Sequence, residues 1–248
     1  MKILYVIIVS FVLFGCENPG DCIKSTGSMV TKEIEVEPFE YIRVYKGIGL
    51  VIKQGDEYKV EVRSGKNLID DIQVLVRENT LFIKDKTTCN WVRDYGQTTV
   101  YITAPNLIEI RSKTEQRIIS DGVLSYPLLR LIAMDKDGDG EEGAGTGDFI
   151  MELDCNQFVI ENNNVANYYI SGKTNDCFIG FYNGNGILRA ENLEINQLSF
   201  YHRGFNDIHV NVSQSITGNL YATGNLILYS NPENVDVTQH YQGRLIYN

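Results

Sequence analysis

A repeat of about twenty residues in the C-terminal half constrains the fold of this chain more than any other feature. A turn residue followed by an apolar residue recurs at intervals of 19, 19, 21, 18 and 19 residues. Between these positions, short runs of β-branched and aromatic residues alternate with Gly, Asn and Asp, and no helical period appears. The six repeated pairs are Asp148-Phe149, Asn167-Tyr168, Gly186-Ile187, Asp207-Ile208, Asn225-Leu226 and Arg244-Leu245.

A period near twenty without helix is typical of a β-solenoid, in which each repeat forms one coil. One coil cannot bury its inward side chains alone, so the coils must stack, with each strand paired to the coils above and below. The corners must turn sharply at recurring places, which accounts for the Gly and Asn there. An antiparallel sandwich is the main alternative, but its turns would fall about every 8 to 12 residues. We therefore predict an all-β solenoid with coils of about 19–21 residues.

The N-terminal half is less regular but also reads as strands. Tyr58, Val60 and Val62 alternate strictly with polar residues, which is the pattern of a half-buried strand. Terminal units of repeat proteins are usually atypical. This half therefore forms either wider first coils or a small sheet that caps the solenoid. We expect one domain over residues 34–248.

The first sixteen residues, MKILYVIIVSFVLFGC, resemble a bacterial lipoprotein signal. An apolar run over residues 3–14 follows Lys2, and it is too short to span a bilayer, which takes about 20 residues. Residues 13–16 resemble the lipobox, although Phe14 is bulkier than the usual small residue. We expect residues 1–15 to be removed, Cys16 to be lipidated, and residues 16–33 to be a tether. The alternative is an ordinary signal peptide with a chance Cys.

Export to an oxidising compartment permits disulfides among the other four cysteines. Cys22 and Cys89 lie in polar stretches, and we expect a bridge between them that ties the arm to the domain. Cys155 and Cys177 lie in strand-like apolar segments, and we expect both to be buried. The chain has no CxxC and its His residues are not clustered, so a zinc site is not expected.

Several of these segments together resemble a known family. They are the lipobox, VYKGIGLVIKQGDEYKVEV (residues 44–62), and the Gly-rich coils that close with GNLILYSNP (residues 224–232). The chain resembles the putative auto-transporter adhesin, head GIN domain family from about Phe39 to Asn248. The resemblance implies a right-handed parallel β-helix on an exported bacterial lipoprotein. It implies no known activity and supplies no catalytic residues.

An acidic insertion departs from the family pattern. GAGTGDFI (residues 143–150) resembles the turn that family members repeat between coils, and DKDGDGEE (residues 135–142) precedes it. Asp135, Asp137 and Asp139 match the start of a calcium loop, and Glu141 is a further candidate ligand. The twelfth loop position, which should be Glu, is Thr146. The alternative to a weak calcium site is a solvated acidic corner, and in either case we expect the fold to stand without calcium.

Catalytic and aromatic candidates are scattered over the coils. Glycoside-cleaving enzymes need carboxylates on one exposed face, and the acids on the coils have different offsets within their repeats. These acids are Asp154, Asp176, Glu191, Glu194 and Asp207, with His202-Arg203 nearby. Exposed aromatic rings could stack on sugars or contact a protein, although most are expected to be core or ladder residues. They are Trp91, Tyr168, Tyr169, Tyr182, Tyr201, Tyr221, Tyr229, Tyr241 and Tyr247.

We therefore expect a lipoprotein of the cell envelope, anchored in the outer membrane by its N-terminal lipid, with an adhesive or ligand-binding role and no catalysis. The ligand is expected to be a glycan or a protein. The formal net charge of -10 argues against nucleic acid. No cofactor is expected apart from weakly held calcium. Two alternatives stay open, a polysaccharide-active enzyme and an envelope-assembly protein that associates through the open ends of the solenoid.

Overall fold

The computed structural model describes residues 23–87, 94, 96–135 and 145–248. Within these ranges the chain forms strands and one short 3-10 turn, η2 (Ile69–Asp71), so the expected all-β class is confirmed. In the described part, no helix is long and apolar enough to cross a membrane. The strands are β1 (Met29–Ile34), β2 (Tyr41–Tyr45), β3 (Ile48–Gln54), β4 (Lys59–Gly65), β5 (Ile72–Arg77), β6 (Thr80–Asp85), β7 (Thr98–Ala104), β8 (Glu109–Lys113), β9 (Ile118–Leu124), β10 (Leu128–Ala133), β11 (Phe149–Asn162), β12 (Asn167–Phe181), β13 (Ile187–His202), β14 (Ile208–Leu220), β15 (Leu226–Leu228), β16 (Asn234–Gln239) and β17 (Leu245–Tyr247).

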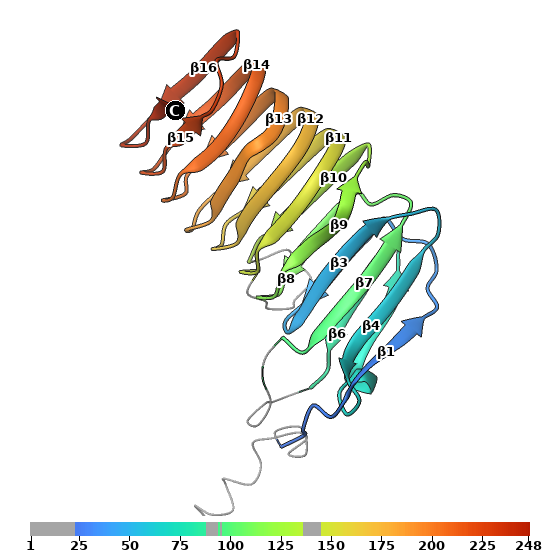
Figure 1. Ribbon diagram of the computed structural model, residues 1–248. Helices are drawn as coiled ribbons and strands as arrows, with labels where there is room; N and C mark the ends of the chain where they lie inside the picture. Colours follow the sequence, from blue (N-terminus) through green and yellow to red (C-terminus); the bar gives the residue numbers. More distant parts are fainter. Residues whose placement is uncertain (1–22, 88–93, 95, 136–144) are drawn as a thin grey trace, which may run out of the picture.

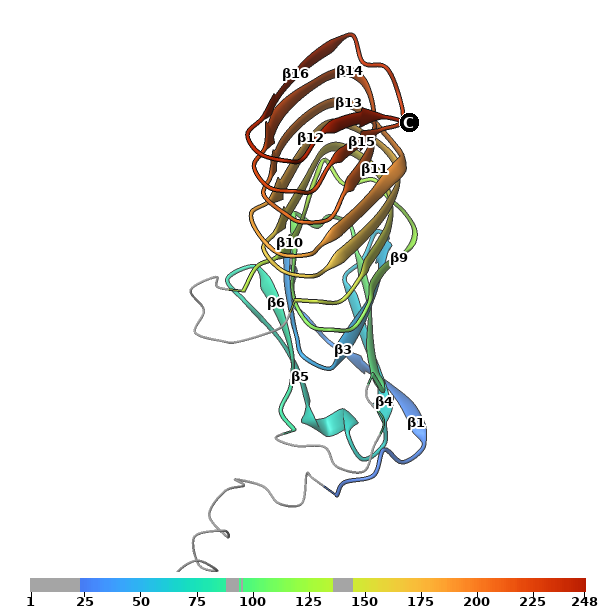
Figure 2. The same cartoon turned by 90° about the vertical axis from the view of Figure 1, so that its left-hand side faces the viewer.

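The sequence repeat corresponds to a stack of parallel coils. β11, β12, β13 and β14 lie side by side in parallel, each in its own coil (Figure 1). β15 and β16 pair with the first and second parts of β14, and β17 pairs with β15. Figure 2 shows these strands bending around a common interior. Each coil from β11 to β14 therefore consists of a long bent strand and a short turn, and the coil after β14 consists of the two short strands β15 and β16.

The register differs from the predicted repeat at one place. The first, fourth and fifth intervals are observed as predicted. In the middle unit, however, Leu188 rather than Ile187 lies beside Tyr168 and Ile208. Leu188 is fully buried, whereas Ile187 is only partly buried. Two adjacent aliphatic residues both fit the repeat, and only the pleat of the strand decides which one faces inward.

The N-terminal half is a mixed sheet rather than a set of parallel coils. β2 and β3 pair in parallel with β6, β8, β7 and β9, but β4 is antiparallel to both β1 and β7. β5 and β6 form an antiparallel hairpin, and Glu78 and Asn79 in its turn have φ of 48° and 61°. A two-residue turn of this kind returns the chain beside the strand it has just left. Of the two forms expected for this half, wider coils or a small sheet, a small mixed sheet is observed. A parallel β-helix does not describe this half, and the hand of the coils stays a prediction.

Two long faces enclose the core. Face A comprises β5, β6, β2, β8, β10, the second parts of β11 to β14, and β16. Face B comprises β1, β4, β7, β3, β9, the first parts of β11 to β14, β15 and β17. The N-terminal sheet thus continues into the coils without a break in hydrogen bonding. The surface of each face is a set of rows that cross the strands.

The core follows the same rows on the inside. Burial of a large apolar side chain contributes about 1.5–3 kcal/mol. In one contact between coils, the rings of Phe149 and Tyr168 stack with centroids 4.9 Å apart. One inward row on face A is Ile42, Ile110, Leu131, Ile160, Ile179 and Phe200, in which every neighbour is a register partner. Buried apolar contacts continue from the N-terminal sheet into the last coils, so the chain has one continuous core.

The acidic insertion lies in sequence between Ile118 and Phe149, two residues that pair across one step of the stack. Ile118 pairs with Phe149, 31 residues later, and its N–H donates to the Asp148 carbonyl at 2.9 Å. After the insertion the chain returns to the stack very closely. A Cβ on Gly147 would lie 1.9 Å from the Gln116 carbonyl oxygen. The described part of the predicted corner turn, residues 145–148, therefore packs against the coil before it.

Gly172 and Gly122 both have positive φ, but only Gly172 is also closely packed against the neighbouring coil. Substituting each one therefore distinguishes the cost of backbone strain from the cost of a steric clash between coils. Gly172 has φ +105°, and a Cβ there would lie 1.9 Å from the Leu153 carbonyl oxygen. Gly122 has φ +88° with open space around it. Gly122→Ala is therefore expected to lower the free energy of unfolding by about 1–2 kcal/mol, and Gly172→Ala by clearly more. Urea unfolding of both variants measures the two losses, and equal losses would show that contact between coils is not what requires Gly172.

Candidate functional site

A groove of about 600 Å³ crosses face B over β9, β11, β12 and β13. It forms where the strand ladder is irregular. The register of β11 shifts against β9 between Ile150 and Glu152, and that of β12 shifts against β13 between Tyr169 and Ser171. We call this the stack groove. The side chains that give it chemical character are Ile150, Glu152, Tyr169, Arg189, Glu191 and Asn192.

A bulge on β13 places Glu191 in the stack groove. Ala190 and Glu191 together stand opposite the single residue Ile170 of β12, and such bulges re-aim the side chains that they carry. The Oε2 atom of Glu191 is buried and has no hydrogen-bond partner in the described part of the chain. A buried acceptor without a partner costs about 1–3 kcal/mol. The groove therefore contains an acceptor that a hydroxyl or N–H donor could satisfy.

Tyr169 supplies an aromatic surface beside this acceptor. It is 42% exposed, and among the described residues its ring contacts no other aromatic ring. Ile150, its register partner, is 39% exposed. Glu152 is exposed, and its backbone N–H donates to the Ser120 hydroxyl at 2.9 Å. An exposed ring face beside carboxylates and an amide is suited to a ligand that has both an apolar face and hydroxyl groups.

An outward row continues from the groove along the axis of the stack. Tyr169, Arg189 and His209 are register partners on successive strands. The Arg189 Nη1 lies 3.1 Å from Nδ1 of His209, and that nitrogen lies 3.2 Å from the Tyr229 hydroxyl. Burial, and then the charge of Arg189, lower the pKa of His209, so this imidazole is neutral near pH 7 and accepts hydrogen bonds through Nδ1. We call Tyr169, Arg189, His209 and Tyr229 the axial strip.

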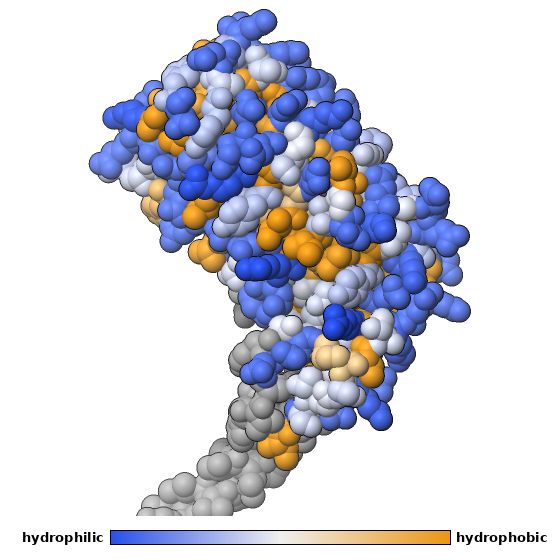
Figure 3. Space-filling view, viewed as in Figure 1, coloured by the Kyte–Doolittle hydropathy of each residue, from blue (hydrophilic) through white to orange (hydrophobic). Residues whose placement is uncertain are grey.

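On its other side the groove adjoins an apolar patch. Val51, Ile119 and Ile150 occupy consecutive positions of the same row, on β3, β9 and β11, and Val123 nearby on β9 is 45% exposed. Figure 3 shows apolar residues gathered in the middle of the visible face. Exposed apolar patches of this kind often mark interaction sites. The row therefore changes from apolar to polar at Tyr169.

Face A carries a polar ladder across its middle strands. The Arg130 guanidinium bridges Glu109 and Glu161, at 2.9 and 2.6 Å. The Tyr182 hydroxyl donates to Glu161 at 2.9 Å. Burial, followed by this hydrogen bond, raises the pKa of Tyr182 to about 12. These groups satisfy one another, so the ladder joins neighbouring coils rather than offering free donors or acceptors.

An aromatic ladder extends the polar one. Ring centroids lie 5.6 Å apart for Tyr182 and Tyr201, 4.8 Å for Tyr201 and Tyr221, and 4.2 Å for Tyr221 and His240. Each ring covers part of the next, and such pairs add about 0.5–1.5 kcal/mol beyond burial. The ladder therefore stabilises the stacking of the coils, although Tyr221 keeps 38% of its surface exposed.

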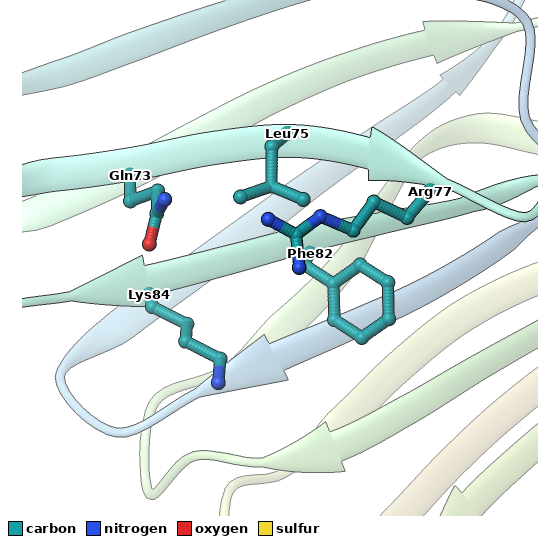
Figure 4. Close-up of a pocket in the computed structure, with 5 residues that line it drawn as sticks. All are labelled: Gln73, Leu75, Arg77, Phe82 and Lys84. Atoms are coloured by element: carbon teal, nitrogen blue, oxygen red, sulfur yellow. The ribbon is translucent and has the colours of Figure 1, made fainter.

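A second, smaller pocket of about 160 Å³ lies on the β5–β6 hairpin. Figure 4 shows Arg77 reaching back from the end of β5 toward Leu75 and Phe82, with Gln73 and Lys84 at the far end. The Lys84 ammonium also lies 4.3 Å from the centroid of the Tyr45 ring. Two cations beside apolar walls suit a small anion. The pocket holds far less than the stack groove and lacks its aligned row of side chains.

Several residues predicted from sequence lie outside the described residues. They are Cys16, Cys22, Cys89, Trp91, Asp137, Asp139 and Glu141, so the lipid anchor, the Cys22–Cys89 bridge and most of the calcium loop stay predictions. Asp135 is described. Its N–H donates to the Asn163 side chain, and its carboxylate accepts a hydrogen bond from Asn164.

The two cysteines within the coils are placed as expected. Cys155 and Cys177 are both buried and both are free thiols. Burial raises the pKa of Cys155 to about 11 and raises that of Cys177 further. Buried thiols of this kind are unreactive.

The candidate acids do not gather at one place. Glu191 lines the stack groove, and Asp154 and Glu194 line a separate depression at the next corner. Asp207 instead accepts hydrogen bonds from the backbone and side chain of Asn225, at 2.8 and 2.9 Å. The sequence interpretation did not single out Arg189 or Glu152, because the register shifts at the stack groove leave no mark in the repeat.

The candidate tyrosines separate into three groups. Tyr168 is fully buried, and Tyr182, Tyr201 and Tyr221 form the aromatic ladder. The remaining ones are exposed, namely Tyr169, Tyr229, Tyr241 and Tyr247. Of these, Tyr169 lies in the stack groove, and Tyr229 contacts His209 of the row that continues from it.

Taken together, a stack of coils that displays rows of outward side chains and a ligand-sized groove defines an all-β scaffold with a binding surface. The chain belongs to the family described as "Putative auto-transporter adhesin, head GIN domain", which matches residues 38–232. The family resemblance inferred from sequence is thereby confirmed. None of the curated proteins matches the chain.

Solved structures share the fold. One described as a putative adhesin from Bacteroides fragilis has a TM-score of 0.79 at 20% identity, over 90% of this chain and 99% of that one. Another described as a putative adhesin, from Parabacteroides distasonis, has a TM-score of 0.67 at 16% identity, over 91% and 99%. A structure described as a putative lipid binding protein, also from Parabacteroides distasonis, has a TM-score of 0.62 at 14% identity, over 90% and 98%. At these identities the likeness concerns the fold alone.

His202, a basic candidate in the sequence, lies in the core. It is fully buried, with Nε2 3.0 Å from the Asn206 carbonyl and no hydrogen-bond partner for Nδ1 in the described part. Its ring meets Phe181 edge-on at 5.8 Å. Burial lowers its pKa from 6.5 to about 4. His202 is therefore unavailable to a ligand at the surface.

This shift predicts a pH dependence of stability. Between pH 6.5 and 4 the unfolded chain binds a proton at His202 and the folded chain does not, so stability falls as pH falls through this window. The loss is on the order of 3 kcal/mol. His202→Leu should remove this part of the slope, because its register partner Leu220 shows that an apolar side chain fits there. Urea unfolding at several pH values measures both proteins, and parallel losses in the two would contradict the assignment.

Proposed function

We propose that this protein is an exported, lipid-anchored protein of the bacterial cell envelope that binds an external ligand through the stack groove, in an adhesive role. The observation that carries the proposal is the groove itself. It combines the exposed face of Tyr169 with an unpartnered acceptor on Glu191, on a rigid parallel scaffold. We also propose that the coils are right-handed, as the family resemblance implies.

The anchor is supported by the sequence of the first sixteen residues and by the position of the arm. Lys24 forms an ion pair with Asp71, and Asn67 donates to the Ser25 carbonyl at 3.0 Å. The arm is thus held beside η2, at the N-terminal end of the sheet. Cys16 lies seven positions before Ile23, a span of at most about 25 Å. A lipid on Cys16 would therefore keep this end near the membrane and leave the coils pointing away from it.

The groove contains carboxylates, but we propose binding without turnover. Glu191 stands on a bulge beside an aromatic ring, and Glu152 lines the same groove. Incubation of the protein with polysaccharides tests this directly. Released oligosaccharides would favour the enzyme alternative.

A second candidate function is the binding of an acyl chain. The apolar patch of Val51, Ile119, Ile150 and Val123 favours it. An acyl chain on this patch would not satisfy Glu191, so the groove supports it less well than a ligand that carries hydroxyl or amide groups. Vesicle binding that survives changes in the groove would favour this candidate.

Anchoring is tested by Cys16→Ser. The variant lacks the thiol that accepts the lipid, so it is expected to move from the membrane fraction to the soluble envelope fraction and to lose incorporation of labelled fatty acid. Cys155→Ser, a change at a buried thiol, is the matched control. Membrane association of Cys16→Ser equal to that of the native chain would contradict the anchor.

Ligand binding through the groove is tested by Tyr169→Ala and Glu191→Gln. Retention of the protein on a panel of neutral polysaccharides and extracellular matrix proteins is measured first. Each variant is expected to weaken binding to the retained member at least about tenfold, which corresponds to about 1.4 kcal/mol. Tyr241→Ala, at a tyrosine that is 60% exposed away from the groove, should leave binding unchanged. Equal effects of Tyr169→Ala and Tyr241→Ala would contradict the proposal.

A further inference from the structure

We infer that the ligand is an extended, uncharged polysaccharide that lies along the axis of the stack, with successive sugar residues above successive coils. This inference rests on the proposed function and adds the class of ligand, its direction and the side chains that set its length. It is carried by the axial strip, which repeats a suitable side chain at each coil.

The first step is the spacing of the strip. Tyr169, Arg189 and His209 are register partners on β12, β13 and β14. Tyr229 follows β15, and its ring centroid lies 5.8 Å from that of His209. Adjacent strands lie about 4.8 Å apart, so the four side chains of the strip span three such steps, or about 14 Å. One sugar ring of an extended chain covers about one such step, so a chain laid along the axis meets a new side chain with each ring.

The second step is the chemistry of the strip. The tyrosines at its two ends are 42% and 38% exposed and can stack on the apolar faces of sugar rings. Between them, Arg189 donates one hydrogen bond to Nδ1 of His209 and has further N–H groups, and the neutral His209 then has its Nε2–H as a donor. A sugar hydroxyl both donates and accepts, so it satisfies either partner. Oε2 of Glu191 is buried in the free protein, so it accepts from a sugar hydroxyl once the side chain turns toward the ligand.

The third step concerns charge. Glu152 and Glu191 face the single cation Arg189 in the stack groove, and the whole chain has a formal net charge of -10. An anionic polysaccharide would be repelled by both. Uncharged sugars avoid this repulsion and keep every hydrogen bond, so the charge of the groove favours them.

The fourth step separates a polysaccharide from the other ligands that a groove could take. A peptide strand binds by adding to the edge of a sheet, but the groove lies on a face where the strands are already paired on both sides. A fatty acyl chain has no donor for Glu191. A folded protein partner could contact the same tyrosines, but nothing would make its affinity depend on the repeat of the coils. Of these ligands, only a polysaccharide chain is expected to bind more tightly as its length along the coils increases.

The experiment uses the purified protein and neutral oligosaccharides of one to six residues, from β-1,4-glucan, β-1,4-mannan, β-1,4-xylan and β-1,3-glucan. Calorimetry measures affinity against length. We expect the affinity for at least one series to rise with each sugar residue up to about four, the number of side chains in the strip, and then to level off. Tyr229→Ala should lower the affinity for the tetramer about tenfold and shorten the dependence on length.

Tyr247→Ala is the control, because Tyr247 is 52% exposed on the last strand and lies outside the strip. Affinity that is independent of length, or equal effects of Tyr229→Ala and Tyr247→Ala, would overturn the inference. If no series binds while a matrix protein binds in a manner that depends on Tyr169, the inference fails and the proposed function stands. If Tyr169→Ala changes no interaction at all, the proposed function fails first.

Discussion

Pairing between successive coils is the constraint on which the rest of the structure depends. A coil of about twenty residues has one inward side chain for every two residues and no partner for them within itself. Only when the next coil lies in register do the inward rows close, as in the row from Ile42 to Phe200. The same register aligns the outward residues into rows, although nothing in the core requires this alignment. The binding strip is therefore a by-product of the geometry that buries the core.

The parallel half of the fold is predictable because its physical cause repeats. Corner residues recur, and the three intervals without irregularity are correct to the residue. Where prediction misses, the reason is local. Ile187 and Leu188 are both aliphatic, and only the pleat decides that Leu188 faces inward. In the N-terminal half the Glu78–Asn79 turn reverses the chain in two residues, a single event that no repeat records.

The site is predictable only in its parts. Tyr169 and Tyr229 stand out as tyrosines on coils, and Glu191 as an acid on a coil. The arrangement of these side chains around one groove cannot be predicted from the sequence, because it depends on a bulge that adds one residue to β13 opposite Ile170. A bulge changes which side chains share a row without changing the period by more than one residue.

The bulge also explains why the groove lies where it does. On a parallel face without a bulge, outward side chains of neighbouring coils contact one another, as the rings of Tyr201 and Tyr221 do on face A. On face B the extra residue breaks the ladder between Tyr169 and Ser171, and the surface opens beside an uncovered ring. The break leaves Glu191 without a partner, which is unfavourable in the free protein. A ligand that donates to this oxygen would offset that loss only when bound, so the unmet acceptor adds to the affinity for the ligand rather than to the stability of the fold.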